Sequence, residues 1–177
     1  MSNFEFFMYS ASPFSNWFPS RFKIDGIEYG CNEQFYMYKK AEFFNDKAIM
    51  AKIMETNSPM EMKRLGKQVK GYNESDWNKV CKEIMSKGLH AKVNIITLVS
   101  LIYSTMLFFQ FSQNVYLKMA LLATAGKTLV EASPYDKKWG IGLLQWDHRA
   151  KSEKTWRGQN WLGYALTELR EDLAKDV

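Results

Sequence analysis

A twelve-residue stretch that begins at Glu33 constrains the fold of this chain more than any other segment. It reads EQFYMYKKAEFF, contains neither Gly nor Pro, and is rich in residues that favour helices. Helical spacing puts Glu33, Met37, Lys40 and Phe44 on one stripe, of the kind that normally faces a protein core. At about 1.5 Å of rise per residue, the Glu33 carboxylate and the Lys40 ammonium would lie roughly 10 Å apart on that face.

Two charged residues on an inward stripe permit two interpretations. Burying a charge is costly unless it is paired or lines a cleft. The stripe therefore predicts either a polar pocket, with an acid or base and a cation for an anionic ligand, or a partly exposed helix edge whose charged ends reach water. The rest of the chain has to decide between them.

Composition narrows the class of protein. A chain of 177 residues with 46% hydrophobic residues predicts one folded domain, residues 1–177, rather than a disordered chain. The net charge of +5 suits an acidic ligand such as a phosphorylated nucleotide. The two cysteines, Cys31 and Cys81, form no CxxC motif, and the first nine residues lack the features of a signal peptide. We therefore expect a cytoplasmic protein, with the nucleus as an alternative, and no membrane association.

The pattern of elements predicts an α+β fold that is mostly helical, with one β-hairpin and small strands. The hairpin spans residues 22–29 and turns at Asp25-Gly26. Besides the helix at 33–44, helices are expected after Asn45 or Asp46, after Ser58 (a Ser-x-x-Glu capping box), from Ser75 or Asp76 to Gly88, at 114–123, and after Asn160. Further strands are expected at 4–8, 128–132 and 139–144.

The segment Val93–Gln110 does not fit its surroundings. Its apolar run, Ile95–Phe109, is short for a transmembrane helix, which needs roughly 20 residues. A buried helix or strand is one interpretation. Removing the segment, however, joins Lys92 to Phe111 in a sensible helix-to-helix connection, and valine and glutamine codons can supply the GT and AG ends of an intron. We hypothesise that residues 93–110 are a retained intron or a gene-model insertion.

Four places combine functional residue types with unusual local sequence. The first is the pair Glu33 and Lys40, and the second is Trp77, for which core packing is the simpler interpretation. The third is the loop 131–140, where Asp136 and Trp139 sit between Pro and Gly. The fourth is the segment 156–160, where Arg157 and a helix start suit an anion, unless Asn160 is only a cap.

Known nucleotide and metal motifs are missing from the sequence. It contains no P-loop, GxGxxG or GxSxG motif, and His90 and His148 stand alone. Carboxylates, tryptophans and a few cations suit a ligand that has a stacking ring and a phosphate. No metal and no cofactor is required.

Taken in order, these motifs resemble the NADAR, or YbiA-like, family over nearly the whole chain. The matching segments are SPFSNWFP (12–19), EQFYMYKKA (33–41), LGKQV (65–69), Trp77, LVEASPYDKKWGIG (129–142), WRGQNWLG (156–163), and KFSQN formed across the segment 93–110, which the family lacks. The resemblance implies a compact, YbiA-like helical domain. It also implies hydrolysis of N-glycosidic bonds, in ribosylaminopyrimidine phosphates of riboflavin synthesis or in ADP-ribose attached to guanine in DNA.

By the same resemblance Glu33 and Asp136 are expected to be catalytic: a carboxylate that stabilises the cationic sugar or activates water, and a residue that orients water or a hydroxyl. The expected substrate-binding residues are Asn16, Trp17, Lys40, Trp77, Trp139, Arg157 and Asn160. Gln34 departs from members that have His there. Two alternatives stay open, namely a non-catalytic ADP-ribose or NAD-binding module and an isoform inactivated by residues 93–110. The oligomeric state is not indicated.

Overall fold

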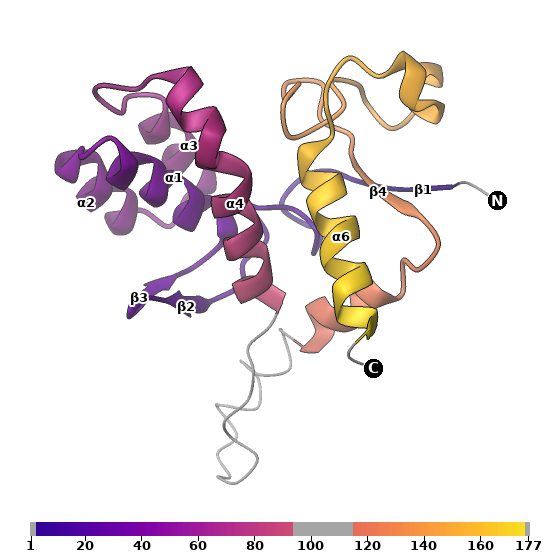
Figure 1. Cartoon of the computed structure of the whole chain (residues 1–177), viewed down its shortest axis with the longest axis horizontal. Helices are drawn as coiled ribbons and strands as arrows, with labels where there is room; N and C mark the ends of the chain where they lie inside the picture. The colour runs from indigo at the N-terminus through magenta and orange to yellow at the C-terminus, as the bar shows by residue number, and fades with distance from the viewer. Residues whose placement is uncertain (1–2, 94–114, 176–177) are drawn as a thin grey trace, which may run out of the picture. The chain divides into compact units, whose positions relative to one another are not determined.

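The computed structural model describes residues 3–93 and 115–175, and the chain divides into two compact units. Unit 1 comprises Met1–Phe18 with Tyr116–Val177, and unit 2 comprises Pro19–Val115. All but the first residue of the segment 93–110 lies outside the described residues. The prediction of a mostly helical fold with small strands is confirmed (Figure 1).

Unit 2 is built around α1 (Asn32–Phe43), which is the helix expected at 33–44. It packs against α2 (Lys47–Glu55), α3 (Pro59–Gly66) and α4 (Glu74–Val93) (Figure 1). Because other helices contact α1 from several sides, its first six residues are buried all round, whatever their polarity. The expected inward stripe therefore holds for Glu33 and Met37, whereas Lys40 and Phe44 are half-buried.

The turns and helix starts of unit 2 follow local chemistry. Strands β2 (Phe22–Ile24) and β3 (Ile27–Tyr29) form the predicted antiparallel hairpin, and both turn residues have positive φ, 51° at Asp25 and 83° at Gly26. The carboxylate of Asp46 accepts a hydrogen bond from the Ile49 amide (3.1 Å). The Ser58 hydroxyl accepts one from the Glu61 amide (3.4 Å). Both predicted caps are confirmed.

The bounds of α4 correct two predictions. The helix is preceded by Asn73, whose side-chain oxygen accepts a hydrogen bond from the Asp76 amide (3.0 Å), so neither Ser75 nor Asp76 is its cap. Gly88 does not end the helix, which continues to Val93. Glycine at this position lets α4 approach α1 closely, because a Cβ at Gly88 would clash with Asn32 Oδ1 and lie 2.6 Å from Cδ1 of Phe35.

Unit 1 contains a short parallel sheet of β1 (Phe4–Phe7) and β4 (Thr128–Glu131), in which Phe4 lies opposite Thr128. Helix α6 (Trp161–Lys175) packs on β4, and residues 115–122 are also helical (Figure 1). Two short 3-10 helices, η1 (His148–Lys151) and η2 (Glu153–Thr155), precede α6 in the chain.

The strand predicted at 139–144 is wrong. This segment is an irregular loop whose backbone bonds go to different partners: the Ile141 amide donates to the Glu131 carbonyl, and the Ile141 carbonyl accepts from the Arg157 amide (both 2.9 Å). Gly142, with a φ of 67°, turns the chain away from a strand.

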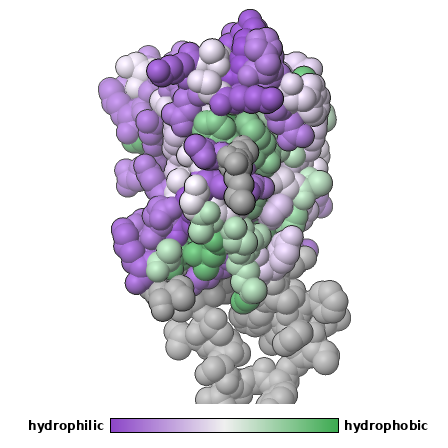
Figure 2. Space-filling view, turned by 90° about the vertical axis from the view of Figure 1, so that its right-hand side faces the viewer, coloured by the Kyte–Doolittle hydropathy of each residue, from purple (hydrophilic) through white to green (hydrophobic). Residues whose placement is uncertain are grey.

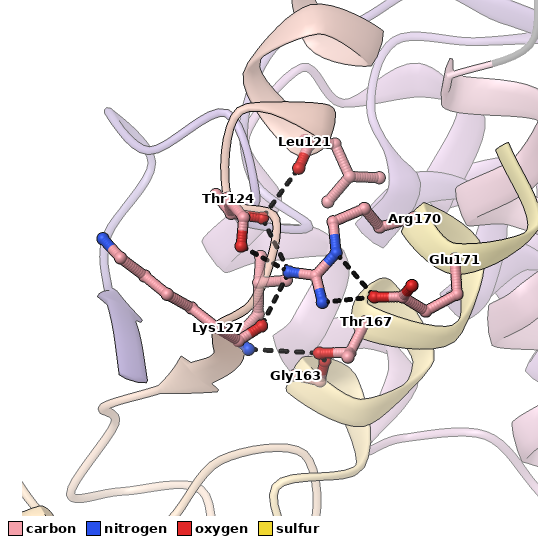
Figure 3. Close-up of polar contacts among 8 residues, drawn as sticks. Leu121, Thr124, Lys127, Gly163, Thr167, Arg170 and Glu171 are labelled. Carbon is pink, nitrogen blue, oxygen red and sulfur yellow. Dashed lines mark hydrogen bonds and ion pairs between the residues drawn. The ribbon is translucent and has the colours of Figure 1, made fainter. Parts of the chain in front are cut away.

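A buried arginine ties α6 to the turn before β4 (Figure 3). Nη1 of Arg170 donates to the carbonyl oxygens of Thr124 (2.7 Å) and Lys127 (2.6 Å), and the Glu171 carboxylate accepts from Nη2 (2.6 Å). Nearby, the Thr167 hydroxyl accepts from the Leu129 amide and donates to the Gly163 carbonyl. These bonds fix β4 to α6, the helix that follows the predicted site segments 131–140 and 156–160.

The surface is mixed. Figure 2 shows a largely hydrophilic face on which hydrophobic side chains gather in the middle and lower parts. Three exposed apolar residues, Val115, Tyr116 and Met119, lie on the helix at 115–122. Among the described helices, none combines the length and the apolar character that crossing a membrane requires.

Candidate functional site

The start of α1 gathers buried polar side chains in unit 2. Cys31, Asn32, Glu33, Gln34 and, from the end of α4, Lys92 are all buried. Buried polar groups at one place are costly for stability, so their presence indicates a functional requirement or a specific structural one.

Glu33 lies in the first turn of α1, where the helix dipole favours a negative charge. The residue is only 5% exposed. Just before it, burial raises the pKa of the Cys31 thiol, and the Glu33 carboxylate raises it further, whereas Lys92 acts in the opposite direction. Carboxylate, thiol and amine therefore lie within electrostatic range at this end of α1.

Gln34 fixes the start of α1 to its neighbours. Its side-chain oxygen accepts from the Gly30 amide (2.8 Å), and its side-chain nitrogen donates to the carbonyls of Ile53 (3.1 Å) and Thr56 (3.4 Å). Gln34, which stands where some members of the resembled family have His, therefore binds the backbone of three neighbouring residues. These bonds restrict the position of the adjacent Glu33.

Lys40 lies in the last turn of α1, and Trp77 of α4 packs against the same end of that helix. The Lys40 ammonium lies 3.9 Å from the centre of the Tyr72 ring, a cation–π contact at a half-exposed position. Trp77 is 2% exposed, donates its indole N–H to the Tyr36 hydroxyl (3.1 Å) and packs on Phe43 and Phe44. Trp77 therefore has the core packing that was the simpler interpretation of the sequence, and its expected contact with a substrate stays a prediction.

In unit 1 the structure brings together the third and fourth predicted places. Oδ1 of Asp136 accepts from the amides of Lys138 (3.1 Å) and Trp139 (2.9 Å), which folds the 136–139 loop into a tight turn. The Trp139 ring meets the Trp161 ring edge-on at 5.7 Å, and the Trp139 carbonyl accepts from the Leu162 amide. The 136–142 loop and the 157–162 segment thus form one structure.

Asn160 joins that structure to β4. The side chain is fully buried: its oxygen accepts from the Glu131 amide (3.0 Å), and its nitrogen donates to the Leu129 carbonyl (2.9 Å). The carbonyl of Asn160 accepts from the Tyr164 amide at the start of α6. Asn160 therefore begins the helix as expected, but its side chain holds the strand instead of capping the helix.

The remaining predicted residues differ in exposure. Asn16 is buried, Trp17 is half-buried, and Arg157 is exposed next to the fully buried Ile141. The Trp17 amide donates to the Ser15 hydroxyl (3.1 Å), which holds the 12–18 loop in a turn. Of the three tryptophans expected to bind substrate, Trp77 and Trp139 are buried and Trp17 is half-buried.

Sequence reasoning missed Lys92 as a buried group. The prediction that α4 ends at Gly88 hid the signal: with the helix continued, Lys92 follows Met85, Gly88 and Leu89 on one apolar face. A lysine on such a face is unusual enough to be noticed.

Comparisons with known proteins agree on one family. The model of the NADAR domain matches residues 6–174. Protein irg-1 of Caenorhabditis elegans is 36% identical over 96% of this chain and 79% of its own length. A protein named N-glycosidase R617, from Acanthamoeba polyphaga mimivirus, is 38% identical over 90% of this chain and 86% of its own length.

A solved structure agrees with the fold. The NMR structure of the Escherichia coli protein YbiA superposes with a TM-score of 0.70 at 28% identity, covering 99% of this chain and 87% of that one. In sequence, a protein named N-glycosidase YbiA from the same species is 32% identical over 91% of this chain and 81% of its own length.

Proposed function

The chain belongs to the NADAR family, and we propose that it is an N-glycosidase, a hydrolase that cleaves the bond between a ribose C1′ and a nitrogen. Relatives with that name match most of this chain. The observation that carries the proposal is the buried carboxylate of Glu33 in the first turn of α1. A carboxylate at such a position suits the positive charge that develops on the sugar as the bond breaks.

The reaction gives Glu33 two roles. As the C1′–N bond lengthens, its electron pair moves to nitrogen and the sugar becomes oxocarbenium-like. We assign to Glu33 the stabilisation of that cation and the acceptance of a proton from the attacking water. Loss of such a group typically lowers the rate by about 10²–10⁴-fold.

The binding roles follow the chemistry of each side chain. Lys40 and Arg157 suit the substrate's phosphate groups, since both are cations with exposed or half-exposed positions. Asp136, whose loop is fixed by its own hydrogen bonds, is assigned to orient water or a ribose hydroxyl. Asn16 is assigned a polar contact beside Trp17.

Base stacking is assigned first to Trp17, because this residue is more exposed than Trp77 and Trp139. Trp77 and Trp139 are assigned further contacts with the base. The Asn160 side chain is occupied by β4, so we assign it the placement of the 136–142 loop.

Two substrate classes fit these groups. One is a ribosylaminopyrimidine phosphate, and the other is ADP-ribose attached to guanine in DNA. Both offer an N-glycosidic bond, a ring and a phosphate, which a carboxylate, a tryptophan and cations can bind.

The test is a panel of two substrates, a ribosylaminopyrimidine phosphate and ADP-ribosyl guanine in DNA, incubated with the full chain. Chromatography of the products is expected to show the free amine or base together with the released ribose compound, in one or both reactions. A matched incubation with a chain that lacks residues 93–110 shows whether that segment inactivates the protein.

The outcomes separate the alternatives. Turnover by the shorter chain alone would identify the full chain as an inactive isoform. Tight binding of either compound with no product from either chain would favour a non-catalytic ADP-ribose-binding module and would contradict the proposal.

A further inference from the structure

The buried amine of Lys92 has no role in the reaction proposed above. It lies in the last turn of α4, and only 1% of the residue is exposed. Lysines are almost never fully buried, because removing an ammonium from water is costly. The chain keeps one here, at the end of a helix whose other lysines, such as Lys87, extend into solvent.

The packing of α4 on α1 brings Lys92 to the start of α1. The side-chain nitrogen of Asn32 lies 3.2 Å from the Met85 sulfur, and Gly88 lies against Asn32 and Phe35. Lys92 follows Gly88 by four residues, one turn further along the same face. The Lys92 amine and the Glu33 carboxylate both act on the pKa of the Cys31 thiol.

Burial sets the protonation of this amine. It lowers the pKa of Lys92 from its ordinary 10.5 to about 7, while Cys31 acts in the opposite direction and to a smaller extent. At neutral pH the side chain can therefore both hold and release a proton, which ordinary lysines do not do.

The described surroundings of α4 contain few charged groups that could act on the Lys92 amine. Among the described residues, the Cys31 thiol just before α1 acts on the Lys92 amine, and Glu33 of α1 acts on the same thiol. Asp25 of the hairpin pairs with Lys87 (2.9 Å) in solvent, and Lys23 of β2 is exposed. Burial and the Cys31 thiol thus set the pKa of Lys92.

Cleavage of an N-glycoside needs a proton donor as well as a carboxylate. An amine or base nitrogen leaves poorly with the bonding electron pair unless it receives a proton as the bond breaks. Glu33, as the group that accepts a proton from water, is not available to give one in the same step.

The geometry points to Lys92 as the general acid of the proposed hydrolysis, donating a proton from its ammonium to the nitrogen that leaves C1′. The C1′–N bond breaks with its electron pair going to nitrogen, which takes the Lys92 proton. A water oxygen then bonds to C1′ and gives a proton to Glu33, and this proton returns through water to the Lys92 amine. One water is consumed, and the products are the free amine and the ribose with a 1′-hydroxyl.

The test compares Lys92→Met and Lys92→Arg with the full wild-type chain, using whichever of the two panel substrates is cleaved. Lys87→Met, the same change at an exposed position of α4, is the control. Lys92→Met is expected to lower kcat by about 10²–10⁴-fold while substrate binding changes little. Lys92→Arg is expected to be as slow, because a guanidinium keeps its proton at neutral pH.

The pH dependence adds a second readout. A general acid must be protonated, so the wild-type kcat/KM is expected to fall as the pH rises through about 7, and this fall should disappear in both variants. NMR of 13Cε-labelled lysine is expected to show one signal titrating near pH 7 that is missing from Lys92→Met, a readout independent of turnover.

Several results would overturn this inference. If Lys92→Arg turned over at the wild-type rate, Lys92 would contribute only its positive charge. If the NMR signal of Lys92 titrated above pH 9, the ammonium would not release its proton near neutral pH and would not be the general acid. A sugar adduct trapped on Lys92 by borohydride would make the amine a nucleophile. No turnover by the wild type would overturn the proposed function and this inference together, whereas turnover by both the wild type and Lys92→Met would overturn the inference alone.

Discussion

Asn160 connects parts of unit 1 that are about thirty residues apart in the sequence. Its backbone has a φ of 51°, a conformation that Asn tolerates better than most residues. Both ends of its amide bond to the backbone of β4, at Leu129 and Glu131. One side chain therefore satisfies two buried backbone groups and places the loop that carries Asp136 and Trp139.

Replacement of Asn160 by Ala is expected to destabilise the protein by about 2–4 kcal/mol, because it leaves two backbone groups of β4 without partners. The free energy of unfolding in urea measures the effect. Asn45→Ala is the matched control, since Asn45 has a similar φ of 56° but is exposed. Equal losses in the two variants would mean that strain alone, not the bonds to β4, explains Asn160.

The crossing of α1 and α4 brings the polar groups of unit 2 together. Gly88 removes the side chain that would otherwise separate the helices, so Asn32 and Phe35 can approach the α4 backbone. The same closeness carries Lys92 to the start of α1. A helix in which glycine is used for contact continues past it, whereas one in which glycine takes a positive φ ends there.

Gly88→Ala is therefore expected to lower the free energy of unfolding by about 1–3 kcal/mol, although Ala is normally the better helix residue. Ser86→Ala, two residues away on α4, serves as the control and is expected to be close to neutral. Thermal unfolding followed by circular dichroism measures both variants. A more stable Gly88→Ala protein would show that the helices do not approach each other this closely.

Local signals in the sequence predicted the elements well where chemistry within a few residues decides the structure. The hairpin at Asp25-Gly26 and the caps at Asp46 and Ser58 are of this kind. Errors arose where distant partners decide. The 139–144 segment bonds to Glu131 and Arg157 instead of to a neighbouring strand.

The candidate site divides in the same way. Residue types and order pointed to Glu33 and to the Asp136 loop. Packing was also the simpler interpretation of Trp77 from the sequence. The bond of its indole to the Tyr36 hydroxyl, and the effect of Lys92 on the Cys31 thiol, depend on how the helices pack.

For the molecule as a whole, the assigned roles are distributed over both units. Unit 2 carries Glu33, Lys40 and Lys92, whereas unit 1 carries the Asp136 loop and Trp17. The family model spans both units, from residue 6 to residue 174. The activity is therefore expected to belong to the full chain, and it is on the full chain that the role of the Glu33 carboxylate has to be measured.

The most direct measurement is the single-turnover rate of N-riboside cleavage by Glu33→Gln, with the cleaved panel substrate in complex with excess protein. Glu42→Gln, an exposed change on the same helix, is the control. We expect Glu33→Gln to fold and bind like the wild type but to cleave about 10²–10⁴-fold more slowly, while Glu42→Gln cleaves normally. Cleavage by Glu33→Gln at the wild-type rate would contradict the role of this carboxylate in the reaction.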